Sequence, residues 1–394
     1  MKFFINSYFG DNQSIGLLSH IKKRLPYGMD DQWMVFSHYT ERGWTVDNLW
    51  HIFTDFYGGQ YAPLAFLSYL VLYAGFGYDP FYFHMFSLLL HIGCVCLVWK
   101  LISSLLRVHG GVSEKQILYV NFITTLLFAV HPINVEAVAW ISALKVLLYA
   151  FFYLLGLLCY LRYIRTSKIF YYVLTIGCFL CSFWGKEQAV TFPLALLIVD
   201  WFTNRNMKNL EVWSEKMSFL IMAFFFGIIT VLSQGKGPYE MIFPLYQRLL
   251  FGCFALVEYI TKSLLPVNLN FFYPFPIVLG EEPPLHYYLY PVVLLFLMGW
   301  IIAYRNNRYL VFGVLLFLVN LLFSIHLFNM SRHAIVADRY MYLSYVGIAF
   351  LIANGIWWLR KRLSYFKAAL VFLFFYCFFL SVYTCLLYTS PSPR

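Results

Sequence analysis

This sequence has little charge: Asp, Glu, Lys and Arg make up only 12% of its 394 residues. Apolar residues make up 61%, against roughly 45–50% in a soluble globular domain. One soluble core would not bury so many apolar side chains, so we expect lipid to be the solvent for much of the chain. The net charge of +10 does not indicate nucleic acid binding, because the excess Lys and Arg lie beside apolar stretches.

Motifs typical of soluble enzymes are also missing. The sequence has no Walker phosphate loop, no GxGxxG after a strand, no nucleophile elbow and no zinc-ligand spacing. These absences exclude soluble nucleotide chemistry and leave no residue predicted to be a metal ligand. The one CxxC, Cys178 and Cys181, lies in an apolar stretch and is interpreted as helix packing.

Ten apolar stretches approach the roughly 20 residues that a spanning helix needs. They are 80–103, 117–131, 143–163, 169–184, 189–203, 217–234, 288–304, 309–328, 339–359 and 366–388. Two further stretches, 61–78 and 246–265, are ambiguous. We therefore predict an all-α polytopic membrane protein of about 10–12 apolar helices, with 61–388 as its transmembrane domain.

The two ends of the chain differ from this pattern. Residues 1–60 contain no continuous apolar region and no signal peptide, so they are expected to form an N-terminal segment and first outer loop after an upstream helix that is missing. Residues 389–394 are interpreted as a disordered or non-native tail. The chain is thus expected to be a fragment.

Five short connections carry clusters of Lys and Arg and indicate the cytoplasmic side. They are 104–116, 162–168, 204–216, 305–308 and 360–367. Even numbers of helices separate them if 246–265, which carries Glu258 and Lys262, lies at the interface instead of spanning. Placing 61–78 along the interface as well brings the remaining polar motifs to the opposite, non-cytoplasmic face.

Asp30 and Asp31 are adjacent carboxylates flanked by aromatic residues. Repulsion near a low-dielectric surface would raise one pKa, which suits a general base that deprotonates an acceptor hydroxyl. The simpler interpretation is a solvated turn or a helix cap, where Asp is common.

The segment HPINVEAVAW supplies His131 and Glu136, which could orient an acceptor or a phosphate or could belong to a helix-capping loop. Lys145 follows at the head of the next helix, where it could meet a phosphate or extend to the membrane interface. In GKEQAVTFP, Lys186 and Glu187 stand in a very short outer connection, either as substrate ligands or as an ion pair that closes the turn.

The segment SRHAIVADRY contains Arg332, His333, Asp338 and Arg339. Basic residues on the non-cytoplasmic side run against the usual charge distribution, and paired Arg side chains suit a phosphate leaving group. An ion pair between Asp338 and Arg339 is the structural alternative. The loop 267–286, rich in Pro and aromatic residues, is expected to cover the site.

In order along the chain, the Asp pair, GGQYAPLAFLSYLVLYAGFGYDPFYFHMFSLLLH, HPINVEAVAW, GKEQAVTFPLALLIVDW and ADRYMYLSYVG resemble a known family. It is the polytopic GT-C glycosyltransferases, in the branch of the transmembrane O-mannosyltransferases that carry tetratricopeptide repeats. The resemblance runs from about Asp30 to about Leu359. It departs from the family pattern at Val146 and Ala62, and the repeats are absent.

The resemblance implies a GT-C core with membrane-parallel helices in the first outer loop and inverting transfer of a sugar, mannose being the expected one. The donor would be a polyisoprenyl-phosphate sugar, and the acceptor a hydroxyl of a protein, lipid or glycan. Asp30 or Asp31 would match the base, whereas Arg332, Arg339 and Lys186 would face the lipid phosphate. No cofactor is required, and a single divalent cation near the Asp pair is compatible with this chemistry.

A transporter or flippase of lipid-linked sugars is the alternative function. Such proteins show repeated halves and polar residues near the bilayer centre, whereas the ionisable groups here lie at helix ends and no internal repeat is visible. We therefore expect an enzyme of a bacterial inner membrane whose active site is on the non-cytoplasmic face.

Overall fold

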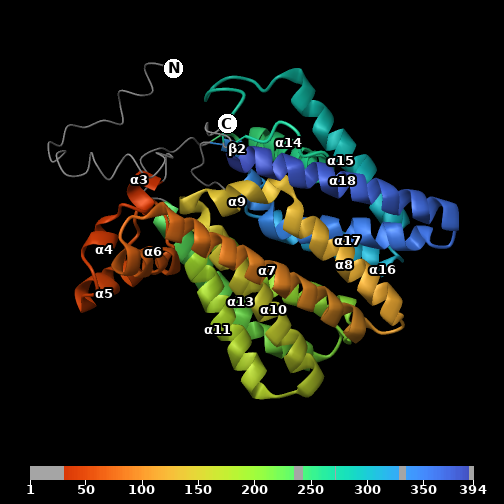
Figure 1. Ribbon diagram of the computed structural model, residues 1–394, viewed down its shortest axis with the longest axis horizontal. Coiled ribbons are helices and arrows are strands. Elements are labelled where there is room, and N and C mark those ends of the chain that lie inside the picture. The colour runs from red at the N-terminus through yellow and green to blue at the C-terminus, as the bar shows by residue number, and fades with distance from the viewer. Residues whose placement is uncertain (1–30, 235–242, 271, 328–333, 390–394) are drawn as a thin grey trace.

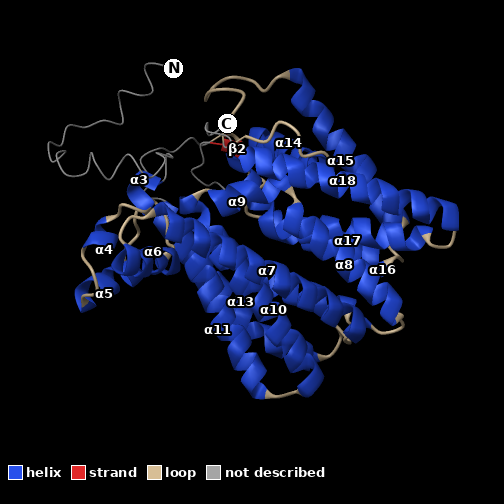
Figure 2. Ribbon diagram, in the orientation of Figure 1, coloured by secondary structure: helices blue, strands red, loops and turns tan. Residues whose placement is uncertain are grey.

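The computed structural model of this protein describes residues 31–234, 243–270, 272–327 and 334–389. Helices account for 79% of the structure. The strands of the described part are β1 (Tyr273–Pro274) and β2 (Ala334–Val336), which pair antiparallel. The prediction of an all-α polytopic membrane protein is confirmed (Figure 2).

Within the described residues, six helices are long and apolar enough to cross a membrane, counting the 3₁₀ turns that lead into three of them. They are α7 (Pro80–His109), α10 (Leu144–Thr166), α13 (Leu210–Gln234), α15 (Tyr290–Ala303), α17 (Met341–Leu359) and α18 (Leu363–Thr389). A seventh span results if α8 (Glu114–Val130) is joined to residues 132–139 across a bend of 51°.

The other predicted stretches are helical too. They form α6 (Pro63–Phe76), α11 (Ile169–Gly185), α12 (Phe192–Phe202), α14 (Leu245–Leu264) and α16 (Arg308–Leu321). At 1.5 Å per residue, α6 is about 21 Å long, short of the roughly 30 Å hydrocarbon core. Its position along the interface stays a prediction.

Local signals in the sequence fix where several helices begin and end. Asp79 caps α7 by accepting a hydrogen bond from the Phe81 N–H at 3.1 Å, and Pro80 follows at the first helical position. The Ser113 hydroxyl caps α8 in the same way. Pro132 stops α8, because it has no N–H to donate and its ring clashes with the preceding turn.

Two glycines let neighbouring helices approach closely. A Cβ atom added to Gly347 of α17 would lie 2.5 Å from the carbonyl oxygen of Gly313 of α16. At Gly185, at the end of α11, it would lie 2.8 Å from the backbone nitrogen of Tyr149 in α10. Small residues at such contacts are typical of helix packing in membranes, where backbones meet directly.

The connections rich in Lys and Arg gather at one end of the bundle, here called the basic end. His109 shares a 2.7 Å hydrogen bond with the carbonyl of Phe202, and Arg308 donates to the carbonyl of Trp201 at 3.1 Å. The Tyr119 and Phe366 rings, 6.0 Å apart, bring the last basic connection beside the first. Charged connections that are far apart in sequence are therefore neighbours in space.

A separate lobe precedes α7, here called the first-loop lobe (residues 31–76). It contains α3 (Asp31–Met34), α4 (His38–Glu41), α5 (Val46–Thr54) and α6 (Figure 1). Its apolar core is distinct from that of the bundle and includes Phe83, Leu144 and Leu148 from α7 and α10. On α5 the Trp50 side chain is 68% exposed, as suits a helix near a membrane surface.

Candidate active site

The connection between α8 and α10 organises the opposite end of the bundle. It comprises the 3₁₀ turn η1 (Pro132–Asn134), α9 (Val135–Ala139) and the 3₁₀ turn η2 (Ile141–Ala143). Tyr69 of α6 donates to the carbonyl of Ile141 at 2.8 Å. Two residues of this connection, Glu136 and Ser142, contact the other predicted motifs.

Glu136 holds Arg339 through two hydrogen bonds. Its carboxylate accepts from the Arg339 backbone N–H at 2.6 Å and from the guanidinium Nη1 at 2.5 Å. The guanidinium also lies 5.0 Å from the centre of the Trp140 ring and 5.2 Å from that of Tyr340. Both charged side chains are largely buried, with 10% and 17% exposed. The ion pair therefore fixes the position and orientation of Arg339 at the start of α17.

Asp338 is buried beside this pair in the 3₁₀ turn η5 (Asp338–Tyr340). The Tyr273 hydroxyl of β1 lies 2.9 and 3.1 Å from its two carboxylate oxygens. Lys262 of α14 donates to the same hydroxyl at 2.9 Å. Burial and the Asp338 carboxylate raise the pKa of Tyr273, so its phenol remains protonated and can donate to Asp338.

Lys186 and Glu187 lie where α11 turns into the 3₁₀ segment η3 (Glu187–Thr191). The Lys186 ammonium is buried, 4.5 Å above the ring of Tyr340. Glu187 is half-buried next to it. Through Tyr340, Lys186 belongs to the same cluster as Arg339, although 153 residues separate the two in sequence.

Asp31 lies at the other end of the α8–α10 connection. Its Oδ1 accepts from the backbone N–H of Ser142 at 2.9 Å and also from the Ser142 hydroxyl. Lys145, three residues further on, is buried and donates to the Gln60 side chain of the first-loop lobe at 2.6 Å. The carboxylate at the start of α3 is thus fixed against the head of α10.

His131 has a local structural environment. It is buried, it accepts at Nδ1 from the Ile133 N–H at 3.2 Å, and its ring centre lies 4.2 Å from that of Tyr345 in α17. These contacts match the helix-capping interpretation, and a contact with substrate stays a prediction. Asp30, Arg332 and His333 lie outside the described residues, so their predicted roles also stay predictions.

Sequence reasoning missed several members of this cluster. Ser142 and Gln60 carry no local signal, because their partners are distant in sequence. Lys262 had a signal, because it is a charged residue inside an apolar stretch. That signal indicated an interfacial position for α14 and did not indicate a place in the site. Tyr273 comes from the loop that was expected to cover the site, and its contact with Asp338 agrees with that expectation.

The site combines cationic side chains, which suit an anionic group, with carboxylates, which suit a hydroxyl-bearing partner. The described residues bring Lys145, Lys186 and Arg339 to the same end as Asp31, Glu136 and Asp338. In a low-dielectric site, cations stabilise phosphate strongly, and a carboxylate can accept the proton of a hydroxyl that contacts it. The Trp140 ring contacts the Arg339 guanidinium, and the Tyr340 ring contacts both Arg339 and Lys186.

Comparison with known proteins identifies relatives that are named protein O-mannosyl-transferases. Protein O-mannosyl-transferase TMTC2 of Mus musculus is 32% identical over 189 residues, which is 44% of this chain and 21% of the relative. Protein O-mannosyl-transferase TMTC4 of Homo sapiens is 31% identical over 167 residues, 37% of this chain and 22% of the relative. Protein O-mannosyl-transferase Tmtc3 of Drosophila melanogaster is 28% identical over 172 residues, which is 39% of this chain and 18% of the relative.

The matches are partial: the chain spans about a fifth of the length of these relatives. No family model matches the chain. No solved structure matches it either. The resemblance predicted from the ordered motifs is nevertheless confirmed, since this chain is homologous, over somewhat under half its length, to the transmembrane protein O-mannosyl-transferases.

Proposed function

We propose that this protein is an inverting GT-C glycosyltransferase that moves mannose from a polyisoprenyl-phosphate donor to a hydroxyl of a protein acceptor. The names of the relatives support the mannose and the protein acceptor. The lipid-linked donor is what the resemblance to the GT-C family implies. A lipid or glycan acceptor is the less supported choice, because the matched relatives are named for action on protein.

Asp31, or its neighbour Asp30, acts as the general base. The carboxylate takes the proton of the acceptor hydroxyl while that oxygen attacks the anomeric carbon of the sugar. The bond between that carbon and the phosphate oxygen breaks, and the electron pair leaves with the polyisoprenyl phosphate. Attack opposite to the leaving group inverts the anomeric centre. Support comes from the rigid position of Asp31, which Ser142 holds with two donors.

Arg339 and Lys186 stabilise the departing phosphate. Charge develops on the bridging oxygen as the bond breaks, and cations already in position stabilise it without reorganising. Glu136 keeps Arg339 oriented, and the Tyr340 ring lies beneath Lys186. Arg332 and His333 are predicted to join these cations from the segment that precedes β2.

One observation carries the proposal: a single connection contacts both halves of this machinery. Ser142 binds the predicted base, and Glu136, six residues earlier, binds a predicted phosphate ligand. A reaction that needs a base on one side of a sugar and a cation on the other suits this arrangement.

The proposed setting is the membrane interface on the non-cytoplasmic side, in a bacterial inner membrane. The distribution of Lys and Arg between the two ends of the bundle supports this orientation. No cofactor is required. A single divalent cation beside the Asp pair remains compatible with the chemistry.

The test is transfer of radiolabelled mannose from polyisoprenyl phosphate to protein in membranes that contain the chain. We expect Asp31→Asn or Asp30→Asn to reduce transfer by about 10²–10⁴-fold at equal expression. Asp47→Asn, at an exposed position of the same lobe, is the matched control and should leave transfer unchanged.

The rival function predicts a different result. A transporter or flippase would carry the lipid-linked sugar across vesicles without forming a mannosylated product. Flipping of a fluorescent polyisoprenyl-phosphate sugar, with no transfer from any donor, would replace the proposed function.

A further inference from the structure

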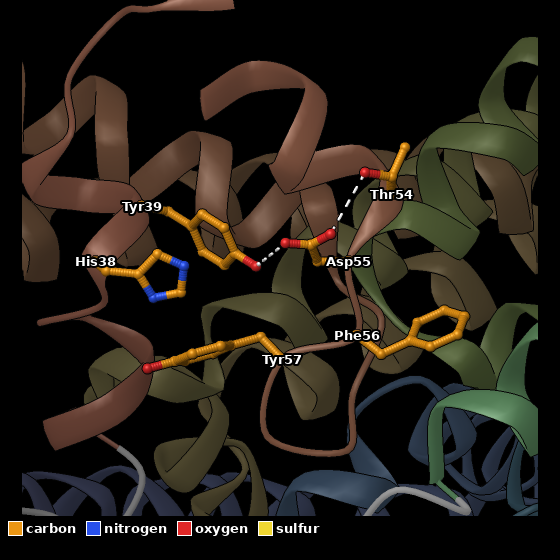
Figure 3. Close-up of a pocket in the computed structure, with 6 residues that line it drawn as sticks. All are labelled: His38, Tyr39, Thr54, Asp55, Phe56 and Tyr57. Atoms are coloured by element: carbon orange, nitrogen blue, oxygen red, sulfur yellow. Dashed lines mark hydrogen bonds between the residues drawn. The ribbon is translucent and has the colours of Figure 1, made fainter. Parts of the chain in front are cut away.

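The first-loop lobe contains an open pocket that the proposed chemistry does not use. It has a volume of about 360 Å³ and is lined by His38, Tyr39, Thr54, Asp55, Phe56 and Tyr57 (Figure 3). The residues come from α4, from the end of α5 and from the loop that follows it. We call it the Asp55 pocket.

The Asp55 carboxylate is held so that one oxygen remains available. Its Oδ2 accepts from the Tyr39 hydroxyl at 3.1 Å and shares a 3.0 Å hydrogen bond with His51 Nδ1. The other oxygen, Oδ1, has the Thr54 hydroxyl at 3.5 Å, which is long for an O–H···O bond. Oδ1 can therefore accept from a ligand without losing the contacts that position the carboxylate.

Aromatic rings form the walls beside this carboxylate. The Tyr39 and Tyr57 ring centres lie 5.4 Å apart, and His38 lies 4.0 Å from Tyr39 and 4.9 Å from Tyr57. The pKa of His38 is lowered, mainly by burial and also by Arg42, so the imidazole stays neutral at pH 7. Ring faces next to a carboxylate attract cations, and aromatic cages of this kind bind ammonium groups.

The charge of the lobe also favours a cation. Residues 38–61 carry three carboxylates, Glu41, Asp47 and Asp55, but only one formal positive charge, Arg42. The whole chain, in contrast, has a net charge of +10. A positively charged group would therefore favour this lobe over most other surfaces of the protein.

The pocket is next to the candidate base. The Tyr57 ring centre lies 6.0 Å from that of Trp33, which is two residues after Asp31 on α3. Backbone hydrogen bonds join Tyr57 to Gln60, and Gln60 accepts from Lys145 at the head of α10. A chain bound in the pocket would thus lie beside α3, the helix that begins at Asp31.

We propose that the Asp55 pocket binds a Lys or Arg side chain of the acceptor polypeptide and so presents a nearby Ser or Thr hydroxyl to Asp31. The polypeptide identity of the ligand rests on the proposed function. The cationic character rests on the pocket itself. A membrane lipid with an amine headgroup offers the same chemistry, and the test separates the two sources.

The test measures binding, which needs no turnover. The full chain is purified in a nonionic polyoxyethylene detergent and titrated against a fluorescent Ser- and Lys-containing peptide, with a second peptide in which norleucine replaces Lys. The Lys peptide should bind about tenfold more tightly, and Asp55→Asn and Tyr57→Leu should each remove that preference. Asp47→Asn removes the same charge outside the pocket and should retain the preference.

Several outcomes would overturn the proposal. These are equal binding of both peptides, equal loss of the preference in Asp47→Asn, and displacement of the Lys peptide by methyl mannoside. Displacement by dodecylphosphocholine at the concentration where the free Lys peptide competes would assign the pocket to a lipid headgroup instead. Since Asp55→Asn removes hydrogen bonds to Tyr39 and His51, Tyr57→Leu keeps the test valid if that variant misfolds.

The two proposals fail separately. If no mannose is transferred but the Asp55-dependent preference for Lys persists, the proposed function is wrong and the cation pocket stands. If transfer occurs and Asp55→Asn leaves the KM for a Lys-containing acceptor unchanged, the pocket has no part in acceptor binding.

Discussion

Arg339 donates two hydrogen bonds to Glu136, one from its backbone and one from its guanidinium, although 203 residues separate them. This pair joins the start of α17 to the connection between α8 and α10. The pair also explains how an Arg can be held near lipid. Glu136 neutralises the guanidinium charge, and the Trp140 ring shields the guanidinium from solvent.

Replacing Glu136 should lower stability because it leaves the Arg339 guanidinium without a counter-charge. Removing one partner of a buried ion pair typically costs about 3–5 kcal/mol. We expect Glu136→Gln to approach the lower value, measured as the loss of free energy of unfolding in detergent. Transfer of mannose should fall as well, because Arg339 is no longer oriented.

The exposed pair Arg107–Glu114 provides the control for this prediction. Its side chains are 56% and 76% exposed, so Glu114→Gln should change the free energy of unfolding by less than about 1 kcal/mol. Equal effects of the two Glu→Gln changes would show that burial gives the Glu136–Arg339 pair no special weight.

Replacing Lys186 should weaken binding of the lipid-linked donor. Lys186→Met removes a buried cation from the cluster around Tyr340, and we expect the KM for the polyisoprenyl-phosphate sugar to rise about tenfold. Lys186→Arg, which keeps the charge, should lose less. Lys168→Met, at an exposed position of the basic end, is the control, and an equal rise in KM there would remove Lys186 from the site.

Acid should destabilise the first-loop lobe through His38. Burial and Arg42 lower the pKa of His38, His51 lowers it slightly, and the Asp55 carboxylate acts in the opposite direction. The unfolded chain therefore binds a proton at a higher pH than the folded one. The contribution of neutral His38 to stability is complete above about pH 6.5, the pKa of an unfolded His. It is lost as the pH falls through the lower pKa of His38 in the folded protein. The thermal midpoint of the purified protein should fall over this range, and less so in His38→Gln.

A buried cluster at the basic end should affect stability without affecting substrate binding. Lys216 of α13 forms an ion pair with Asp200 of α12, and both side chains are fully buried. Lys216→Met leaves Asp200 paired with Arg205 alone, at 3.2 Å, so we expect the free energy of unfolding to fall by up to about 3 kcal/mol. Lys208→Met, exposed in the same connection, should have little effect. A change in donor KM without a loss of stability would contradict a structural role.

The helices were predictable because their signals are local. Each of the twelve apolar stretches is helical, and caps such as Asp79 and breakers such as Pro132 stand at their boundaries. The number of helices long enough to span was not predictable from apolar runs alone. The apolar stretch 189–203, for example, begins inside the 3₁₀ turn η3 (Glu187–Thr191). The α-helix α12 that follows is therefore shorter than the apolar stretch.

The contacts of the candidate site were predictable in part, and the roles of its residues stay predictions. Glu136 and Arg339 were both expected at the same face, but Arg339 was considered with its neighbour Asp338, whereas Glu136 is the partner that holds it. Asp338 accepts instead from Tyr273, a residue of a loop that sequence reasoning treated only as a cover. Partners far apart in the chain leave no mark in a local pattern.

The sequence by itself determined that this chain is a helical membrane protein and which family it resembles. It also predicted which polar motifs lie on the side opposite the basic connections. Hydrophobic length, capping residues and the distribution of Lys and Arg are properties of short segments, so they can be read without a fold. Only the tertiary structure decided that Ser142 holds Asp31, that Glu136 holds Arg339 and that Asp55 faces an aromatic pocket. Those contacts depend on how helices pack and turn against one another, and packing brings together residues that no local pattern relates.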